Sequence, residues 1–220
     1  MREIPFVADE YYHIYAHSVG DLELFKNARD FERFIVTLFL ANGKKDIPRL
    51  DRSSDLNRVW VIRDGKINLG DPLVDIVGFC VMPNHFHFLL GERKDGNISI
   101  FMHRVLVSYA KYFNLKYERR GHVFESKFNA KHIVDDNYLL RVSSYIHLNP
   151  KDLRAYKRKE QDYPWSTFQD YVKENRWGKL LCTNPINDHF SNPREHYNFV
   201  SGARSDIIDS EFDFKRTRLT

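Results

Sequence analysis

The sequence predicts an α+β fold built on one antiparallel sheet. Strand-like and helix-like segments alternate in the order strand, helix, two strands, helix, strand, helix. The two central strands are joined by too few residues for a crossover, so we expect them to pair antiparallel. The composition, 42% hydrophobic and 15% aromatic, is that of a chain that buries a core. A ferredoxin-like antiparallel sheet with helices packed on one face fits this order best.

The first elements are a strand and a long helix. Residues 11–18 are rich in β-forming side chains and predict the first strand. Aromatic and aliphatic residues at helical spacing predict a helix over residues 28–41. Gly43 follows where a helix often needs a residue that tolerates positive φ. Residues 44–57 are polar and are predicted to form a loop.

Two strand pairs are predicted next. Asp64-Gly65 lies between β-prone segments and indicates a hairpin near residues 58–69, which we interpret as an accessory to the sheet. Residues 74–82 form an apolar run typical of a buried strand. Pro83-Asn84 then turns the chain into a second strand that starts at His85.

The remaining elements of the main domain are a helix, a strand and a second helix. Apolar residues repeat at intervals of three and four from Ile98, which predicts a long amphipathic helix ending near Gly121. Residues 124–134 return as a strand. Asp135 or Asp136 can cap a helix that runs on to Pro150.

The length of 220 residues indicates one main domain with a tail. We expect a domain at 1–171, including the accessory hairpin, and a C-terminal extension of unknown role at 172–220, where Asn192-Pro193 predicts a short helix. No signal peptide and no membrane-spanning run is seen, so we expect a cytoplasmic protein without membrane contact. Two cysteines, Cys80 and Cys182, fit a reducing compartment.

The net charge of +4 is modest, but basic residues gather in two clusters. The first cluster contains Lys111, Lys116, Arg119, Arg120 and Lys127, and the second contains Lys151, Arg154, Lys157, Arg158 and Lys159. Tyrosines are interleaved with both. Basic groups neutralise phosphates and aromatic rings stack on unpaired bases, so the clusters suggest nucleic acid. The alternative is a solvated helix face with tyrosines in the core.

A histidine pair lies in the strand that follows Pro83-Asn84. Successive side chains of a strand point to opposite faces, so His85 and His87 share one face. Phe86 and Phe88 occupy the other face, which can pack on the core. Two imidazoles on one face predict a metal site, although buried histidines also serve structural roles.

A tyrosine and an asparagine are placed where they can join this site. Tyr145 and Asn149 are four residues apart near the end of the predicted helix, and residues at that spacing face the same way. A nucleophile and a metal ligand could therefore lie side by side. Pro150 disfavours helical backbone at Asn149, which predicts a distorted last turn and leaves the direction of the amide open.

Several motifs together resemble the single-tyrosine HUH transposases of insertion sequences and the REP-associated tyrosine transposases. They are Pro83-Asn84-His85-Phe86-His87, Tyr112-Phe113-Asn114 with Tyr117, Arg120-Gly121-His122-Val123-Phe124, Tyr145-Ile146-His147-Leu148-Asn149-Pro150 and Tyr163-Pro164-Trp165-Ser166. The resemblance covers about residues 11–171. It implies a ferredoxin-like nuclease of the HUH type, single-stranded or hairpin DNA as partner, and a divalent cation. It leaves a homodimer open, because some relatives assemble the site from two subunits.

The resemblance also implies the site residues. Tyr145 matches the nucleophile, His85 and His87 match the metal pair, and Asn149 matches the third ligand. A tyrosine with an ordinary pKa near 10 is a poor nucleophile at neutral pH, so an adjacent cation is useful. Imidazole favours manganese, whereas phosphate oxygens and abundance favour magnesium, so we expect Mg or Mn.

Attack by Tyr145 on a phosphodiester would give a 5′-phosphotyrosine link and a free 3′-hydroxyl, which is strand transfer rather than hydrolysis. We expect the chain to be such a DNA endonuclease and strand transferase. The expected phosphate contacts are Lys127, Lys151 and Arg154, with Arg119 and Arg120.

Other residues and functions remain open. Tyr112 and Tyr138 are alternative nucleophiles, and His147 is expected to face away from Tyr145. His103, His122 and His132 are expected at the surface, and Trp165 is expected to be a packing anchor. A non-catalytic nucleic-acid-binding module with an RNA-recognition-like sheet is the main alternative function. A phosphoesterase that uses water, and a replication or mobilisation nickase, are further alternatives.

Overall fold

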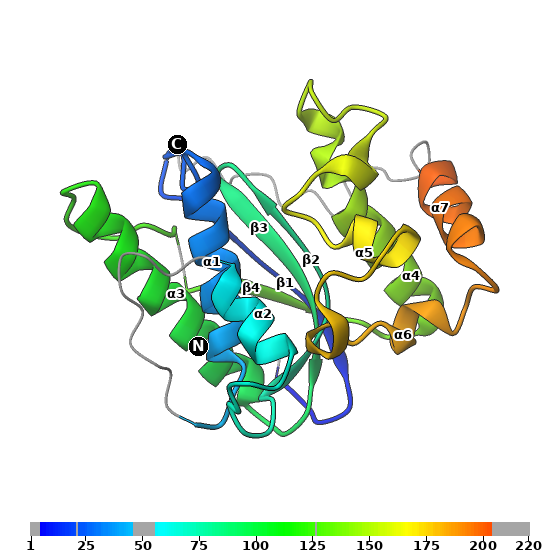
Figure 1. Ribbon diagram of the computed structural model, residues 1–220, viewed down its shortest axis with the longest axis horizontal. Coiled ribbons are helices and arrows are strands. Elements are labelled where there is room, and N and C mark those ends of the chain that lie inside the picture. The colour runs from blue at the N-terminus through cyan, green and yellow to red at the C-terminus, as the bar shows by residue number, and fades with distance from the viewer. Residues whose placement is uncertain (1–4, 21, 46–55, 126, 204–220) are drawn as a thin grey trace.

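The structure is a computed structural model that describes residues 5–20, 22–45, 56–125 and 127–203 (Figure 1). Its strands are β1 (Tyr11–His17), β2 (Val74–Met82), β3 (His85–Glu92) and β4 (Asn129–His132). Its helices are α1 (Ala28–Ala41), α2 (Asn57–Arg63), α3 (Asn97–Lys116), α4 (Asp136–Leu148), α5 (Phe168–Val172), α6 (Asn184–Asn187) and α7 (Pro193–Gly202). Short 3-10 helices lie at η1 (Asn149–Asp152), η2 (Glu160–Asp162) and η3 (Gly178–Leu180).

The strands form one sheet in the order β2-β3-β1-β4, and every neighbouring pair is antiparallel. With α1 and α3 this is the ferredoxin-like arrangement, so the predicted α+β class is confirmed. Helices α1 and α3 contact each other and cover one face of the sheet. Helix α4 lies against β2 and β3 on the opposite face, and α6 and α7 contact α4 there (Figure 1). Helices therefore lie on both faces of the sheet, and not on one face as the sequence predicts.

The face of the sheet under α1 and α3 holds the aromatic core. Phe86 and Phe88 of β3 are fully buried, and their rings lie 5.2 and 6.0 Å from that of Phe34 on α1. Tyr109 of α3 packs edge-on to Phe34 at 5.0 Å, and its hydroxyl donates to the carbonyl of Leu24 at 2.8 Å. This side of β3 therefore anchors the strand and leaves its other side for polar groups.

A chain segment after η2 covers the outer edge of β2. The amide of Val81 donates to the carbonyl of Trp165, and the amide of Thr167 donates to the carbonyl of Phe79, each at 2.9 Å. Exposed edge strands invite pairing with other chains, so this cover protects the sheet. The Trp165 ring stacks on Phe31 of α1 at 4.9 Å, which makes it the packing anchor that the sequence predicts.

The predicted hairpin near residues 58–69 is wrong, because residues 57–63 form α2. Val59 and Ile62 are three residues apart and both are buried, which is helical spacing. Gly65 has φ of 74° and its amide donates to the carbonyl of Ile62. Asp64-Gly65 therefore ends a helix and does not form a hairpin turn. The same dipeptide suits both positions, because glycine tolerates a positive φ.

Gly43 follows α1 for a different reason than the predicted positive φ. Its φ lies outside the left-handed region, and Asn42 is the residue that caps the helix. A Cβ at Gly43 would collide with the backbone carbonyl of Leu69. The position needs a glycine because two chain segments approach closely there.

Helix α3 and strand β4 are shorter than predicted, and the C-terminal extension is partly helical. Helix α3 ends at Lys116, before Gly121, and β4 keeps only residues 129–132 of the predicted strand, with Phe124 in an isolated bridge to Ser18. Residues 46–55 of the predicted loop lie outside the described residues. So do residues 204–220 of the extension, whose described part packs α7 against α4 and α5. In the described part of the chain, no helix is long and apolar enough to cross a membrane.

Candidate active site

The histidine pair of β3 lies on the face of the sheet that meets α4. His85 and His87 are on this face with ring centroids 5.2 Å apart, while Phe86 and Phe88 point into the core. His85 is half-buried and His87 is buried. The strand alternation predicted from the sequence is therefore observed. The His85 ring is partly accessible to a substrate, whereas the His87 ring is buried.

Strand β1 adds two histidines to the same face. In the register of β1 and β3, Tyr15 lies opposite His87 and His17 lies opposite His85. The His17 ring stacks on His85 at 5.0 Å, and Nε2 of His13 lies 2.9 Å from Nδ1 of His87. Sequence analysis missed both. Their signal was the alternation of His13, Tyr15 and His17 in the first strand, but only the pairing of β1 with β3 brings them to the site.

Helix α4 carries the tyrosine to this face. Asp135 caps the helix by accepting a bond from the amide of Tyr138 at 2.7 Å. Val142 and Ile146, one turn apart, are fully buried, and Tyr145 lies next to Ile146 on the same turn. The half-buried Tyr145 ring lies edge-on to His87, with ring centroids 5.2 Å apart, and edge-on to His13 at 5.8 Å. The tyrosine and the histidine pair converge within one chain.

Asn149 completes the constellation. Its backbone is helical, with φ of −50° and ψ of −40°, so Pro150 does not displace the last turn, and the chain continues as η1. Nδ2 of Asn149 donates to the carbonyl of Tyr145 at 2.9 Å, and Oδ1 lies 3.3 Å from Nε2 of His85. The amide oxygen points at His85, which settles the direction that the sequence left open.

The imidazoles of the site are held neutral. Burial lowers the pKa of His85 to about 4, and the nearby His17 adds to this shift. Burial, with the neighbouring His13, His85 and His17, lowers the pKa of His87 well below its ordinary value. Burial and the charge of Lys131 lower the pKa of His13 to about 3. Neutral imidazoles have a lone pair available, which is the form that binds a metal.

The contacts of His85 test whether a cation fits. A neutral imidazole has one N–H group. In His85 the proton is on Nδ1, because Nδ1 lies 2.7 Å from Oδ1 of Asn84, which can only accept. Nε2 then directs a lone pair toward Oδ1 of Asn149, which is also an acceptor because Nδ2 is engaged by Tyr145. Two acceptors that face each other at 3.3 Å are the arrangement that a bound cation would satisfy. The residues therefore fit a divalent metal.

The ligand set would be two imidazoles and an amide oxygen. Among the described residues, no group of three His, Cys, Asp or Glu side chains is placed to hold a metal ion. The proposed site contains two side chains of these four types, His85 and His87, and Asn149 supplies the third ligand. Its remaining positions would be open to water and phosphate oxygens, as catalytic metal sites require.

The other candidates lie away from the pair. Tyr112 is on α3, on the opposite side of the sheet, and its hydroxyl donates to Asp30 at 2.9 Å. Tyr138 lies two helical turns before Tyr145. His147 is buried and faces Thr167, with 3.2 Å from Nε2 to Oγ1, as its predicted direction away from Tyr145 requires.

The surface histidines fall largely where the sequence places them. His103 and His122 are exposed, and His132 is half-buried and pairs with Glu10 at 2.8 Å.

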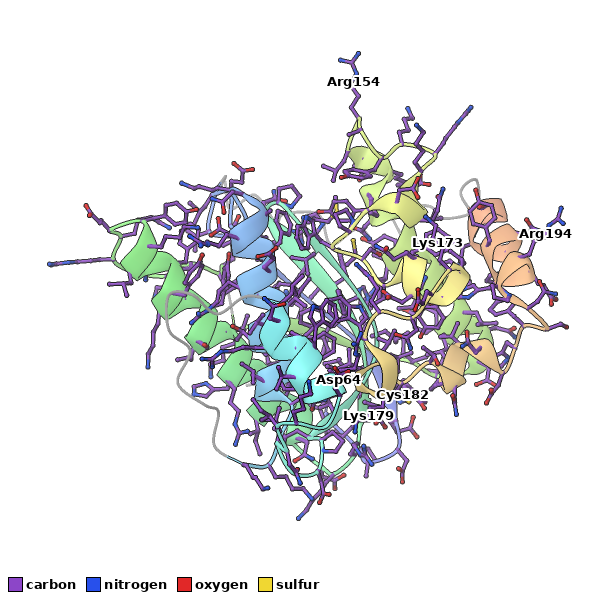
Figure 2. The ribbon with its side chains drawn as sticks, viewed as in Figure 1. Asp64, Arg154, Lys173, Lys179, Cys182 and Arg194 are labelled. Atoms are coloured by element: carbon purple, nitrogen blue, oxygen red, sulfur yellow. The ribbon has the colours of Figure 1, made fainter. Side chains whose placement is uncertain are left out.

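The predicted phosphate contacts fall on two segments of the chain. Lys151 and Arg154 follow Asn149 directly, and Arg154 projects outward from the chain beyond α4 (Figure 2). The segment before Lys127 is tied to the end of β1, because the amide of Glu125 donates to the carbonyl of His17 at 3.0 Å. Arg119 and Arg120 precede this segment, and the Arg119 guanidinium packs over the Phe113 ring.

Two of the comparisons with known proteins found matches. No curated protein matches the sequence. A solved structure described as a REP-associated tyrosine transposase bound to a REP hairpin matches with a TM-score of 0.45 and 16% identity, over 87% of this chain and 94% of that chain. The family described as "Transposase IS200 like" matches residues 69–149, which span β2 to Asn149 and contain all four predicted site residues. The family match is limited to this central region of the chain, and it bears out the resemblance seen in the sequence.

Proposed function

We propose that this chain is a metal-dependent single-stranded DNA endonuclease and strand transferase that uses Tyr145 as its nucleophile. The observation that carries the proposal is the convergence of three elements at one end of the sheet. The Tyr145 ring lies 5.2 Å from that of His87, and Asn149 links the same helical turn to His85. No second subunit is needed to bring these groups together, which supports a site formed within one chain.

Tyr145 is the nucleophile of the proposed reaction. The Tyr145 oxygen forms a bond to phosphorus while the bond from phosphorus to the 3′-oxygen breaks. The phenol proton is lost to solvent, and the leaving 3′-oxygen takes up a proton as it departs. One phosphoester replaces another, so a second 3′-hydroxyl can reverse the step with a different strand.

The histidines and the asparagine hold and orient the cation. A divalent ion, Mg or Mn, bound by His85, His87 and Asn149 would neutralise the charge that grows on the phosphate and favour the phenolate of the nucleophile. Nδ1 of His85 donates to Asn84, which fixes the ring so that Nε2 points into the site. The bond from Asn149 to the carbonyl of Tyr145 holds the tyrosine turn at a constant distance from the ligands.

The DNA is proposed to cross the end of the sheet between the two groups of basic residues. Lys151 and Arg154 would contact phosphates on the α4 side, and Lys127, Arg119 and Arg120 would contact them on the other side. Such contacts position a strand without reading its sequence. A non-catalytic nucleic-acid module is less well supported, because α4 covers the sheet face that an RNA-recognition sheet leaves open for bases.

The test uses a pool of hairpin oligonucleotides with randomised single-stranded flanks and a label at the 3′ end. With Mg or Mn, the proposal expects the label to migrate with the protein after denaturation, because Tyr145 captures the 5′-phosphate of the 3′ fragment. A 5′ label should be released on a free fragment. Cleavage without any adduct would indicate attack by water, and binding without cleavage would indicate the non-catalytic module.

Variants of the site assign the roles. Tyr145→Phe should abolish the adduct and leave DNA binding within about twofold, whereas Tyr138→Phe, on the same helix, should keep it. His85→Ala with His87→Ala should remove metal-dependent cleavage. An adduct that survives Tyr145→Phe would place the nucleophile elsewhere, and full activity of the double variant would remove the metal from the proposal.

A further inference from the structure

His13 is a buried histidine directly behind the candidate metal pair. It is fully buried, and its ring stacks on that of His87 with centroids 5.1 Å apart. In the β1 and β3 register it lies opposite Leu89, one diagonal step from His87 on the same face. Its Nε2 is 2.9 Å from Nδ1 of His87.

We propose that His13 is a positioning residue that accepts a hydrogen bond from Nδ1 of His87 and so aims the other nitrogen of His87 at the metal. This inference rests on the proposed function, because it concerns the same cation. It assigns to His13 a role in the affinity and geometry of the site and no direct contact with the DNA.

The argument follows from counting protons. Two neutral imidazoles in contact share one N–H between their facing nitrogens. If His87 binds the metal through Nε2, its Nδ1 must carry the proton and donate it, so His13 must accept. A partner on the second nitrogen fixes the tautomer and orientation of a metal-binding histidine and raises its basicity.

His85 shows the same arrangement with a different partner. Its Nδ1 lies 2.7 Å from Oδ1 of Asn84, which can only accept. Both imidazoles of the pair are therefore held through Nδ1, one by an amide oxygen and one by His13. The shared pattern leaves Nε2 of each ring out of these contacts, and Nε2 of His85 lies 3.3 Å from Oδ1 of Asn149.

Because His13 is buried, water could not readily replace it as the hydrogen-bond acceptor of His87. Water cannot readily take the place of a side chain with no exposed surface, so loss of the acceptor would leave Nδ1 of His87 buried and unsatisfied. The Tyr145 ring also packs edge-on to His13 at 5.8 Å. His13 thus supports both the ligand and the ring of the nucleophile.

Titration calorimetry with Mn²⁺ alone tests the inference without relying on catalysis. His13→Leu removes the acceptor and should weaken Mn²⁺ binding about 10- to 100-fold. His13→Gln places an amide oxygen where Nε2 was and should restore the affinity to within about threefold of wild type. His189→Gln, an exposed histidine after α6, should leave it unchanged.

A second readout reports the proton itself in the wild-type protein. Long-range ¹H–¹⁵N spectra of the Zn²⁺-loaded chain should show His87 protonated at Nδ1 and His13 unprotonated at Nε2. This measurement holds even if His13→Leu fails to fold. The opposite tautomer, or equal Mn²⁺ affinity in His13→Leu and wild type, would overturn the inference.

The failure of the proposed function gives a different result. If wild-type protein does not bind Mn²⁺, or if His85→Ala with His87→Ala binds it normally, the proposed metal site is refuted, and so is the role proposed for His13. If wild type binds Mn²⁺ through the pair and His13→Leu binds it equally well, only the role of His13 is wrong.

Discussion

One side chain, Asn149, joins the proposed nucleophile to the proposed metal ligands, with its Oδ1 3.3 Å from Nε2 of His85. Its Nδ2 donates to the carbonyl of Tyr145 at 2.9 Å, so the two ends of one amide engage both parts of the site. The turn of α4 that carries the tyrosine is therefore coupled to β3 by a short polar link. Changes to Asn149 should separate the binding of metal from the placement of the tyrosine.

Substitution of Asn149 should distinguish its two functions. Asn149→Asp keeps an oxygen for the cation and loses the donor to Tyr145, so Mn²⁺ affinity should hold or rise while adduct formation falls by about tenfold. Asn149→Ala should lose both. Calorimetry with Mn²⁺ and the rate of adduct formation measure the two effects. Equal Mn²⁺ affinity in Asn149→Ala and wild type would exclude Asn149 as a ligand.

The basic residues that flank the site should set the salt dependence of DNA binding. Each phosphate contact contributes a slope of about 0.7 in the dependence of log affinity on log salt for a single strand. Lys151→Ala and Arg154→Ala should each lower the slope by about this amount. Lys179, an exposed lysine at the other end of the molecule, provides the control (Figure 2). If Lys179→Ala lowers the slope as much as Arg154→Ala, DNA does not bind where we propose.

Gly43 should be sensitive to a single added methyl group. Gly43→Ala forces a Cβ against the carbonyl of Leu69 and should lower the free energy of unfolding by about 1 to 3 kcal/mol. Gly202→Ala at the end of α7 meets nothing within 4 Å and should leave stability unchanged or raise it by up to about 1 kcal/mol. Urea unfolding measures both. Equal effects would mean that close approach does not explain the glycine.

The fold should lose stability in acid through its buried histidines. Burial lowers the pKa of His196 to about 4 from an ordinary 6.5, so between these values the unfolded chain binds a proton that the folded chain does not. The stabilisation is complete above pH 6.5 and is lost as the pH falls toward 4. The contribution of this group should fall by about 2 kcal/mol between pH 7.5 and pH 5.

His196→Phe isolates that contribution. The His196 ring stacks on Phe190 at 4.5 Å, so a phenyl ring can keep the packing without taking up a proton. Urea unfolding at pH 7.5 and pH 5 should show that the variant loses about 2 kcal/mol less than wild type. Identical losses would show that His196 is not held neutral in the folded chain.

Much of the fold could be predicted because its signals are local and periodic. The bounds predicted for α1 and β2 are those observed, since both carry long apolar patterns of one period. The face shared by His85 and His87 followed from strand alternation alone. The segment at 58–69 failed because Asp64-Gly65 serves a helix end as well as a hairpin, and only the burial of Val59 and Ile62 decides between them.

The part of the site that escaped prediction depends on pairing between distant strands. Nothing near His13 in the sequence says which nitrogen of which residue it will meet, because that is fixed by the register of β1 on β3. The convergence of Tyr145 with the pair likewise depends on α4 lying on the face opposite α1 and α3. Local sequence motifs identified the residues of the site, whereas packing between distant segments determines how these residues contact one another.

Peptide mapping of the covalent adduct tests the central claim most directly. Trypsin cleaves after Arg141 and Lys151, which releases a peptide of residues 142–151 whose only tyrosine is Tyr145. After nuclease digestion of the trapped DNA, mass spectrometry should find a 5′-phosphate-linked nucleotide remnant on this peptide. A remnant on any other peptide, or cleaved DNA with no remnant on the protein, would contradict the account.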